Sequence, residues 1–347
     1  MKTLAIGLMS GTSLDGLDIC LAEFEKQEQW TFQILKTETI PYSESWESKL
    51  RNAIHLSAEE LLELHSEYGF YLGKQVLQFI EKYQLENISL IASHGHTVFH
   101  QPQRKFTLQI GDGRAIKITT GLPVVYDFRS QDVLMNGNGA PLVPIGDELL
   151  FPEYHACLNL GGFSNISLAC NGKRIAFDIV PVNIVLNKLA QQLGKSFDEQ
   201  GDLARKGKVD EVLLAKLNSL DFYGQHHPKS LGIEWCNQYI FPILENIETQ
   251  NSLATFTEHI AQQISTVINR YNIRNILFTG GGAYNTFLIE KIKGKTSAEV
   301  IVPVKEIIEH KEALVFAFMG VLRMNNEINV LSSATGSIAD HCSGIML

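Results

Sequence analysis

A strand, a glycine-rich turn and a second strand open this chain, and this stretch constrains the fold more than any other. The apolar run before Ser10 enters the turn, and the apolar run 19–22 leaves it. Glycines permit φ > 0 and close approach of the backbone to a ligand, while hydroxyls and carboxylates can hold a phosphate and its metal ion. An ordinary hairpin turn that binds nothing is the alternative for one such turn. The candidate ligand-binding residues are Gly11, Thr12, Ser13, Leu14, Asp15, Gly16, Leu17 and Asp18, with Asp15 as the candidate metal ligand.

Two further glycine-rich turns follow strands downstream. The apolar strand 155–159 runs into Gly161 and Gly162 and a returning strand, which repeats the opening unit. This repeat predicts two related domains, each offering a turn to a nucleotide's phosphates. A dinucleotide-binding turn is the competing interpretation of the third turn, but GxGxxG is not matched and no acidic residue about 20 positions on ends a second strand. The third turn follows strand 275–279 and contains Gly280, Gly281, Gly282 and Asn285.

The composition limits the class of partner. The chain has 347 residues, of which 45% are apolar, and a net charge of −9. This is long enough for two cores, and the acidic balance disfavours binding to nucleic acid or to an anionic membrane. Five scattered cysteines predict neither a disulfide framework nor a zinc site. Because no leader and no apolar run of about 18 residues is present, we expect a soluble, cytoplasmic protein.

A coarse reading of periodicity predicts an α/β protein. Strands are expected near 3–9, 17–24 and 31–40, and a long helix follows a capping-box pair at Ser57 and Glu60. We place an N-terminal domain at 1–130 and a C-terminal domain at 131–336, connected near the glycine-rich stretch 136–141. The tail 337–347 either packs back on the first domain or frays.

Polar residues follow two predicted strands, where ligands of α/β proteins usually bind. Arg129 can clamp a carboxylate or a sugar hydroxyl, and its structural alternative is an ion pair with Asp127 or Asp132. Asp178 can take a proton from an attacking nucleophile, and its structural alternative is to cap the next helix. Three histidines, 94, 96 and 100, permit a metal site, but neutral imidazoles also serve as hydrogen-bonding groups in polar clefts.

Nine segments in family order resemble the signature segments of anhydro-N-acetylmuramic acid kinases, which belong to the actin-like ATPase and sugar kinase superfamily. They cover nearly the whole chain, and together they are highly specific. The segments are Met9–Asp18, Ser93–Thr97, Gln109–Gly113, Val125–Arg129, Gly139–Pro144, Asn159–Gly162, Pro228–Ser230, Gly280–Asn285 and Glu312–Ala317.

The resemblance implies a two-domain actin-like ATPase (ribonuclease H-like) fold with a nucleotide cleft between the domains. It implies an enzyme of peptidoglycan recycling that uses ATP and Mg²⁺ to open 1,6-anhydro-N-acetylmuramic acid and phosphorylate O6, and it implies a homodimer. Asp178 matches the family's base, and the three glycine turns match its ATP-binding segments. The substrate-binding residues that it implies are His94, Asp127, Arg129 and Glu312.

The chain departs from the family pattern beside the base. Where the family usually reads Asp-Thr-Gly-Pro-Gly-Asn, residues 178–183 read Asp-Ile-Val-Pro-Val-Asn, and β-branched residues avoid φ > 0 and block close backbone approach. Asn187 and Ile233 also replace the Asp and Arg that the family tends to carry. One alternative is therefore a weakened relative that senses ATP or an amino sugar without turnover. The other is a chaperone-like ATPase, which would need an appended peptide-binding domain.

Overall fold

The computed structural model describes residues 2–11, 14–245 and 247–347, and the chain forms two compact units. Unit 1 contains Met1–Phe151 and His310–Leu347, and unit 2 contains Pro152–Glu309. The sequence placed the boundary at 130/131 and residues 310–336 in the second domain, so the structural division lies elsewhere. Long-range contacts cause the difference, because residues soon after Arg129 bind partners in the last 38 residues of unit 1.

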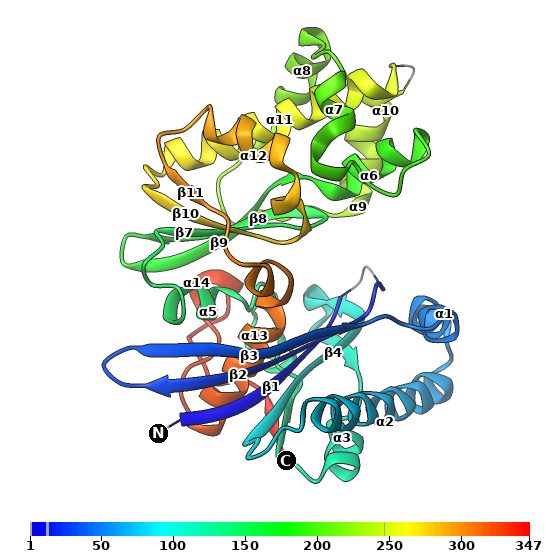
Figure 1. Cartoon of the computed structure of the whole chain (residues 1–347), viewed down its shortest axis with the longest axis vertical. Coiled ribbons are helices and arrows are strands. Elements are labelled where there is room, and N and C mark those ends of the chain that lie inside the picture. Colours follow the sequence, from blue (N-terminus) through cyan, green and yellow to red (C-terminus); the bar gives the residue numbers. More distant parts are fainter. Residues whose placement is uncertain (1, 12–13, 246) are drawn as a thin grey trace. The chain divides into compact units, whose positions relative to one another are not determined.

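Unit 1 is built on a seven-stranded mixed sheet with the order β12-β6-β4-β1-β2-β3, and β5 pairs with β4. Strands β1, β2, β3 and β4 of this sheet are labelled in Figure 1. Strands β1, β2 and β3 form an antiparallel meander, while β1, β4 and β6 run parallel. The meander confirms the three strands predicted from the sequence. The bounds are β1 Lys2–Ser10, β2 Leu17–Lys26, β3 Trp30–Ile40, β4 Leu90–Gln101, β5 Phe106–Ile110, β6 Val124–Tyr126 and β12 Ile345–Met346.

Unit 2 repeats this arrangement in a five-stranded sheet with the order β11-β10-β7-β8-β9. Strands β7, β8 and β9 form the antiparallel meander, and β10 runs parallel to β7 and β11. Each strand of the order β6-β4-β1-β2-β3 therefore has a counterpart, which is the duplicated arrangement of the actin-like ATPase fold predicted from the sequence. The bounds are β7 Ala156–Leu160, β8 Phe163–Cys170, β9 Lys173–Pro181, β10 Asn275–Thr279 and β11 Glu299–Ile301.

Helices flank both sheets, and none of the described helices is both long and apolar enough to cross a membrane. All five cysteines are free thiols. In unit 1 the helices are α1 Glu44–Asn52, α2 Ala58–Tyr83, α3 Gly113–Thr120, α4 Ser130–Leu134, α5 Pro144–Leu149, α13 Lys305–Met324 (from His310 onward) and α14 Ser332–Thr335. In unit 2 they are α6 Asn183–Gln192, α7 Asp202–Lys206, α8 Glu211–Asn218, α9 Ile233–Trp235, α10 Phe241–Leu244, α11 Thr249–Arg270 and α12 Thr286–Lys293, with a π-helix at Cys236–Ile240.

Helix α2 begins where the sequence predicted it. The Ser57 side chain accepts a hydrogen bond from the Glu60 amide, and the Glu60 carboxylate accepts one from the Ser57 amide. These two bonds satisfy amides that a helix start otherwise leaves unpaired. The cap therefore fixes the start of the helix whose buried face covers one side of the unit 1 sheet.

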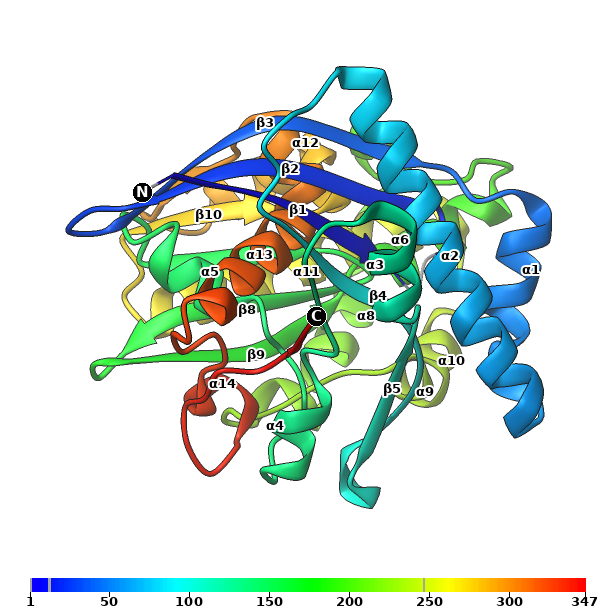
Figure 2. The ribbon, with the colours of Figure 1, turned by 90° about the horizontal axis from the view of Figure 1, so that it is seen from below.

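The C-terminal segment also belongs to unit 1. Figure 2 shows α14, in red, beside α4, and the Thr335 hydroxyl of α14 donates to the Asp132 carboxylate of α4 at 2.7 Å. The last strand, β12, pairs with β6. Of the two alternatives left open by the sequence, the tail packs and does not fray.

Strand β1 packs its two faces differently. Ile6 and Leu8 point into the core beneath α2, and Gly7 points to the other face, as alternation along a strand requires. A Cβ at Gly7 would lie only 1.9 Å from the Ala313 carbonyl oxygen of α13. The close approach of α13 to the sheet therefore requires glycine at this position.

We expect Gly7→Ala to destabilise the protein by about 1–3 kcal/mol, because the methyl group would force β1 and α13 apart. Urea unfolding followed by circular dichroism measures the change. Gly224→Ala is the matched control, because a Cβ at Gly224 meets no atom within 4 Å. Equal unfolding midpoints for the two variants would contradict the packing argument.

Candidate active site

The turn between β1 and β2 packs against the end of β3. A Cβ at Gly16 would lie 2.7 Å from the Ile40 carbonyl oxygen, so this buried glycine is required for packing. The positive φ expected of a glycine falls instead on Leu14, at 61°. Thr12 and Ser13, both predicted to bind ATP, lie outside the described residues.

The side chains of this turn divide into apolar and acidic groups. Leu14 and Leu17 are buried in the unit 1 core, so only their main chains are available to a ligand. Asp15 is exposed, whereas Asp18 is half-buried and its Oδ1 accepts from Thr39 Oγ1 at 2.5 Å. Among the described residues no three His, Cys, Asp or Glu side chains gather as a metal site. Mg²⁺ held mainly by phosphates needs only one or two carboxylates, and exposed Asp15 fits that requirement.

Arg129 is held by two neutral acceptors in unit 1. Its Nε donates to His94 Nε2 at 2.8 Å, and its Nη1 donates to the Gly139 carbonyl oxygen at 2.5 Å. The ion pair with Asp127 or Asp132, the structural alternative, is not found among the described residues. Burial lowers the pKa of Arg129 to about 10, opposed by the carboxylates of Glu312 and Asp132, so the guanidinium stays cationic near neutral pH. Its Nη2 makes no hydrogen bond with the residues that the structure describes.

His94 is suited to this role because it is neutral. Its Nδ1 lies 2.9 Å from the Gly95 carbonyl oxygen, which only a protonated Nδ1 can approach as a donor, and Nε2 is then the acceptor for Arg129. Burial, with the charge of Arg129, holds the pKa of His94 well below its usual value. The other two histidines of β4 bind elsewhere, His96 to Ser10 and His100 to Thr107.

Asp127 and Glu312, the remaining predicted substrate residues, differ in environment. Asp127 is a half-buried residue with a positive φ of 55°, and its Oδ1 accepts from the Ser130 amide at 3.2 Å. A non-glycine residue in this region is uncommon and is often found at functional sites. Glu312 lies on α13 with its side chain exposed, and its charge acts on Arg129. Unit 1 thus brings His94, Arg129 and Glu312 together, and Asp127 lies two residues before Arg129 in the chain.

In unit 2 the second and third glycine turns pack against each other. A Cβ at Gly280 would lie 2.3 Å from Asn159 Oδ1, and one at Gly282 would lie 2.8 Å from the Leu160 Cβ. These two glycines are required for packing. Gly162 and Gly281 are different, because their nearest described neighbours would lie 4.0 Å from a Cβ. The open side of the paired turns is therefore at these two positions.

Two asparagines fix the paired turns. Asn183, the first residue of α6, donates from its side-chain Nδ2 to the Leu160 carbonyl oxygen at 3.1 Å. Its main-chain N–H donates to the Gly161 carbonyl oxygen at 3.2 Å. Asn285, predicted to contact the nucleotide, caps α12 by accepting from the Leu288 amide at 3.0 Å. Asn285 thus has a structural role, whatever else its Nδ2 contacts.

Asp178 lies near the end of the edge strand β9, and residues 229–231 hold it on two sides. Its amide donates to the Lys229 carbonyl oxygen at 3.1 Å, and its Oδ2 accepts from the Leu231 amide at 2.8 Å. Its Oδ1 makes no hydrogen bond with the described residues. Burial raises the pKa of Asp178 to about 6, opposed by the Leu231 amide and the charge of Lys229. Because α6 has no side-chain cap, the capping alternative for Asp178 is wrong.

The β-branched residues after Asp178 point into the core. Ile179 is the extra residue of a β-bulge, since Ser164 pairs with Val180 and Asn165 with Asp178. Ile179, Val180 and Val182 are 1%, 0% and 0% exposed. The sequence-based expectation that these residues block close approach to the backbone stays a prediction, and their side chains pack in the unit 2 core.

Sequence reasoning missed the residues that hold the candidate groups. The segment Pro228–Ser230 was given no role, although Lys229 and the adjacent Leu231 hold Asp178. Gly139 was also named only within a motif, although the Gly139 carbonyl binds Arg129. The only available signal was that Lys229 and Gly139 lie in segments that resemble the family's signature segments, because the partners lie far apart in the sequence.

Comparisons with known proteins show which family this chain is similar to. The family model described as anhydro-N-acetylmuramic acid kinase matches residues 3–346. An anhydro-N-acetylmuramic acid kinase of Francisella tularensis subsp. novicida is 32% identical over 96% of this chain and 95% of the relative, and one of Pseudomonas fluorescens is 37% identical over 83% of each. The resemblance inferred from the sequence is confirmed. Among solved structures, the activator of the 2-hydroxyisocaproyl-CoA dehydratase from Clostridium difficile has a TM-score of 0.46 and 14% identity, over 94% of this chain and 97% of that one.

We expect Asp178→Asn to stabilise the protein at pH 8 by about 1–3 kcal/mol. Because burial raises the pKa of Asp178 from 3.8 to about 6, the folded state loses stability as the pH rises between these values, and asparagine avoids that loss while still accepting from Leu231.

Urea unfolding at pH 4 and pH 8 tests this expectation, with exposed Asp221→Asn as the control. The advantage of Asp178→Asn over its control should shrink at pH 4. An advantage that is absent, or equal at both pH values, would show that the buried charge does not destabilise the folded state.

Proposed function

The chain belongs to the anhydro-N-acetylmuramic acid kinase family, and on that premise we propose that it converts 1,6-anhydro-N-acetylmuramic acid, ATP and water into N-acetylmuramic acid 6-phosphate and ADP. The water oxygen bonds to the anomeric carbon, and the bond from that carbon to the bridging oxygen breaks. The bridging oxygen, which becomes O6, takes the γ-phosphoryl group. The observation that carries the proposal is Asp178, whose pKa is raised to about 6 and whose Oδ1 is open.

Asp178 is the proposed general base. A base must be unprotonated near neutral pH and still basic enough to accept a proton from water, and a pKa near 6 meets both requirements. Because the Leu231 amide donates to Oδ2, we assign proton acceptance to Oδ1. Holding the carboxylate from the 229–231 segment fixes its direction, which supplies the orientation that water attack needs.

Arg129 is the proposed substrate-side cation. The sugar carries a lactyl carboxylate and hydroxyls, and a guanidinium binds such groups with directed N–H donors. Because the partners of Arg129 are a neutral imidazole and a carbonyl, its positive charge is not cancelled by an ion pair. Asp127 and exposed Glu312 add acceptors for sugar hydroxyls beside it.

The three glycine turns are the proposed ATP-binding segments. In unit 2 the open sides of Gly162 and Gly281 leave room for a ligand to approach the main chain. In unit 1 we assign Asp15, the exposed carboxylate of the opening turn, to a Mg²⁺ ion carried by the phosphates. Such an ion supplies neutralisation of the charge on the phosphoryl group. A cytoplasmic location, a homodimer and a part in peptidoglycan recycling complete the proposal.

A sensor without turnover is the remaining alternative, and no comparison favours it. This alternative was based on the β-branched residues Ile179, Val180 and Val182, whose side chains are buried in unit 2. The kinase is therefore the function that the residues support best.

The direct test measures ADP release from Mg-ATP with and without 1,6-anhydro-N-acetylmuramic acid, together with mass spectrometry of the sugar. We expect sugar-dependent ADP release and a product heavier by one water and one phosphoryl group. In ¹⁸O-labelled water the label should enter at the anomeric carbon and not in the phosphate. Asp178→Asn should lose both products, and Asp221→Asn should keep them. Binding of ATP and sugar without turnover would support the sensor instead.

The pH dependence tests the role of Asp178 separately. Because only the ionised carboxylate accepts a proton, kcat/KM should rise with pH through an acid limb near 6. The charge of Lys229 lowers the pKa of Asp178, so Lys229→Met should move this limb upward by about 0.5–1 unit. Lys195→Met, at an exposed lysine, is the control. An acid limb that stays in place in Lys229→Met would argue against Asp178 as the titrating base.

A further inference from the structure

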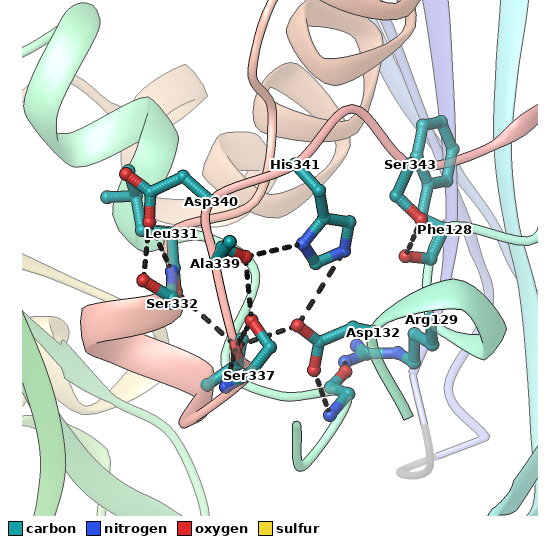
Figure 3. A network of polar contacts seen from close by, with 12 residues as sticks. Phe128, Arg129, Asp132, Leu331, Ser332, Ser337, Ala339, Asp340, His341 and Ser343 are labelled. Carbon is teal, nitrogen blue, oxygen red and sulfur yellow. Dashed lines mark hydrogen bonds and ion pairs between the residues drawn. The ribbon is translucent and has the colours of Figure 1, made fainter. Parts of the chain in front are cut away.

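The C-terminal segment of unit 1 contacts the main chain on both sides of Arg129 (Figure 3). On the N-terminal side, the Ser343 hydroxyl donates to the Phe128 carbonyl oxygen at 2.8 Å. On the C-terminal side, the Ile338 amide donates to the Met135 carbonyl oxygen at 3.1 Å. The stretch that carries Arg129 is therefore held by residues more than 200 positions later in the chain.

One residue, Gly139, links Arg129 to a buried carboxylate through its main-chain N–H and C=O. The Gly139 carbonyl accepts from Arg129 Nη1 at 2.5 Å, and the Gly139 amide donates to Asp132 Oδ2 at 2.7 Å. Asp132 is 0% exposed, and its own carbonyl accepts from the Gly137 amide at 2.8 Å. A Cβ at Gly137 would lie 2.1 Å from Asp132 Oδ2, so the 137–139 loop wraps closely around this carboxylate. The position of the acceptor for Arg129 thus depends on Asp132.

The partners of Asp132 Oδ1 come from the C-terminal segment. The Thr335 hydroxyl donates to Asp132 Oδ1 at 2.7 Å, and His341 Nε2 lies 3.7 Å from the same oxygen. Thr335 also accepts from the Asn138 amide at 2.8 Å through its carbonyl. A buried carboxylate without such partners is costly. The segment therefore satisfies Asp132 and holds the 137–139 loop at the same time.

We propose that Asp132 and Thr335 are positioning residues for substrate binding, which act through Gly139 to fix the direction of the Arg129 guanidinium. The proposal rests on the assignment of Arg129 to the sugar in the proposed function. The C-terminal segment thereby helps to hold the residues of the proposed sugar site in place. The chain from Thr335 to Asp132, Gly139 and Arg129 is a continuous series of hydrogen bonds.

The alternative is that this network only stabilises unit 1. Both roles predict a loss of stability when a hydrogen bond is removed, so stability cannot separate them. They differ in which ligand is affected, because a misdirected Arg129 weakens the binding of the sugar but not the binding of ATP. They also differ in coupling, because a residue that acts through Arg129 has no further effect once Arg129 is changed.

The test is a double-mutant cycle between Thr335→Val and Arg129→Lys in the full-length protein. Valine keeps the shape of threonine and removes the hydroxyl, and lysine keeps the charge of arginine but loses the two bonds to His94 and Gly139. Titration calorimetry measures the affinity for 1,6-anhydro-N-acetylmuramic acid and, separately, for Mg-ATP. Ser332→Ala is the matched control, because its hydroxyl donates to Asp340 and not to Asp132.

We expect Thr335→Val to weaken sugar binding about fivefold, as the loss of one hydrogen bond would, with ATP affinity unchanged. In the Arg129→Lys background the same change should have no further effect, and Ser332→Ala should bind sugar as the parent does. Asp132→Asn, folded as judged by circular dichroism, should repeat the sugar-specific loss.

Two outcomes overturn the inference in distinguishable ways. A fivefold effect of Thr335→Val that persists in the Arg129→Lys background, or an equal effect in Ser332→Ala, would make the network merely structural and leave the proposed function standing. Unchanged sugar affinity in Arg129→Lys alone would remove Arg129 from the sugar site and overturn both this inference and that part of the proposed function.

Discussion

Main-chain pairing of consecutive antiparallel strands is the constraint on which both units depend. The pairing of β1 with β2, and of β7 with β8, places a glycine turn beside a strand that runs parallel to the first of the pair. This strand is β4 in unit 1, where Ser10 pairs with His96, and β10 in unit 2, where Asn159 pairs with Thr279. The polar His96 of β4 and the glycines that follow β10 are thereby brought next to a turn. The same hydrogen-bonded frame serves twice, and each unit fills it with different polar chemistry.

The polar chemistry of unit 1 keeps a cation available by separating it from the buried carboxylate nearby. If Arg129 bound Asp132 directly, the pair would neutralise both charges. Instead Arg129 has a neutral imidazole and a carbonyl as partners, while Asp132 receives a hydroxyl and an amide. The main-chain N–H and C=O of Gly139 join the two groups, so they are fixed with respect to each other without forming an ion pair. In unit 2, burial raises the pKa of the Asp178 carboxyl group. Its Oδ2 accepts from the Leu231 amide, and its Oδ1 makes no hydrogen bond with the described residues.

Local patterns predicted the elements, and distant contacts decided the rest. The meander β1–β3 and the capped start of α2 follow from apolar alternation and a four-residue motif, both of which are visible in the sequence. The histidines of β4 interrupt its apolar pattern, although His96 is buried against Ser10, 86 positions earlier. The boundary of unit 1 was missed because Asp132 binds Thr335 across 203 positions. Asp178 was found from its place after a strand, whereas its holder Leu231 lies 53 positions away.

The residues after Asp178 show how β-branched side chains fit where the family usually has glycines. A bulge at Ile179 turns two successive side chains toward the unit 2 core, where burial of each contributes about 1.5–3 kcal/mol. The Val182 amide donates to the Gly162 carbonyl oxygen at 2.8 Å, so it is already engaged by the paired glycine turn. The main chain at 179–182 therefore contributes packing and pairing, and the open positions of the paired turns are Gly162 and Gly281. β-Branched residues are compatible with the paired turns here because their side chains pack in the core while the main chain pairs with Gly162.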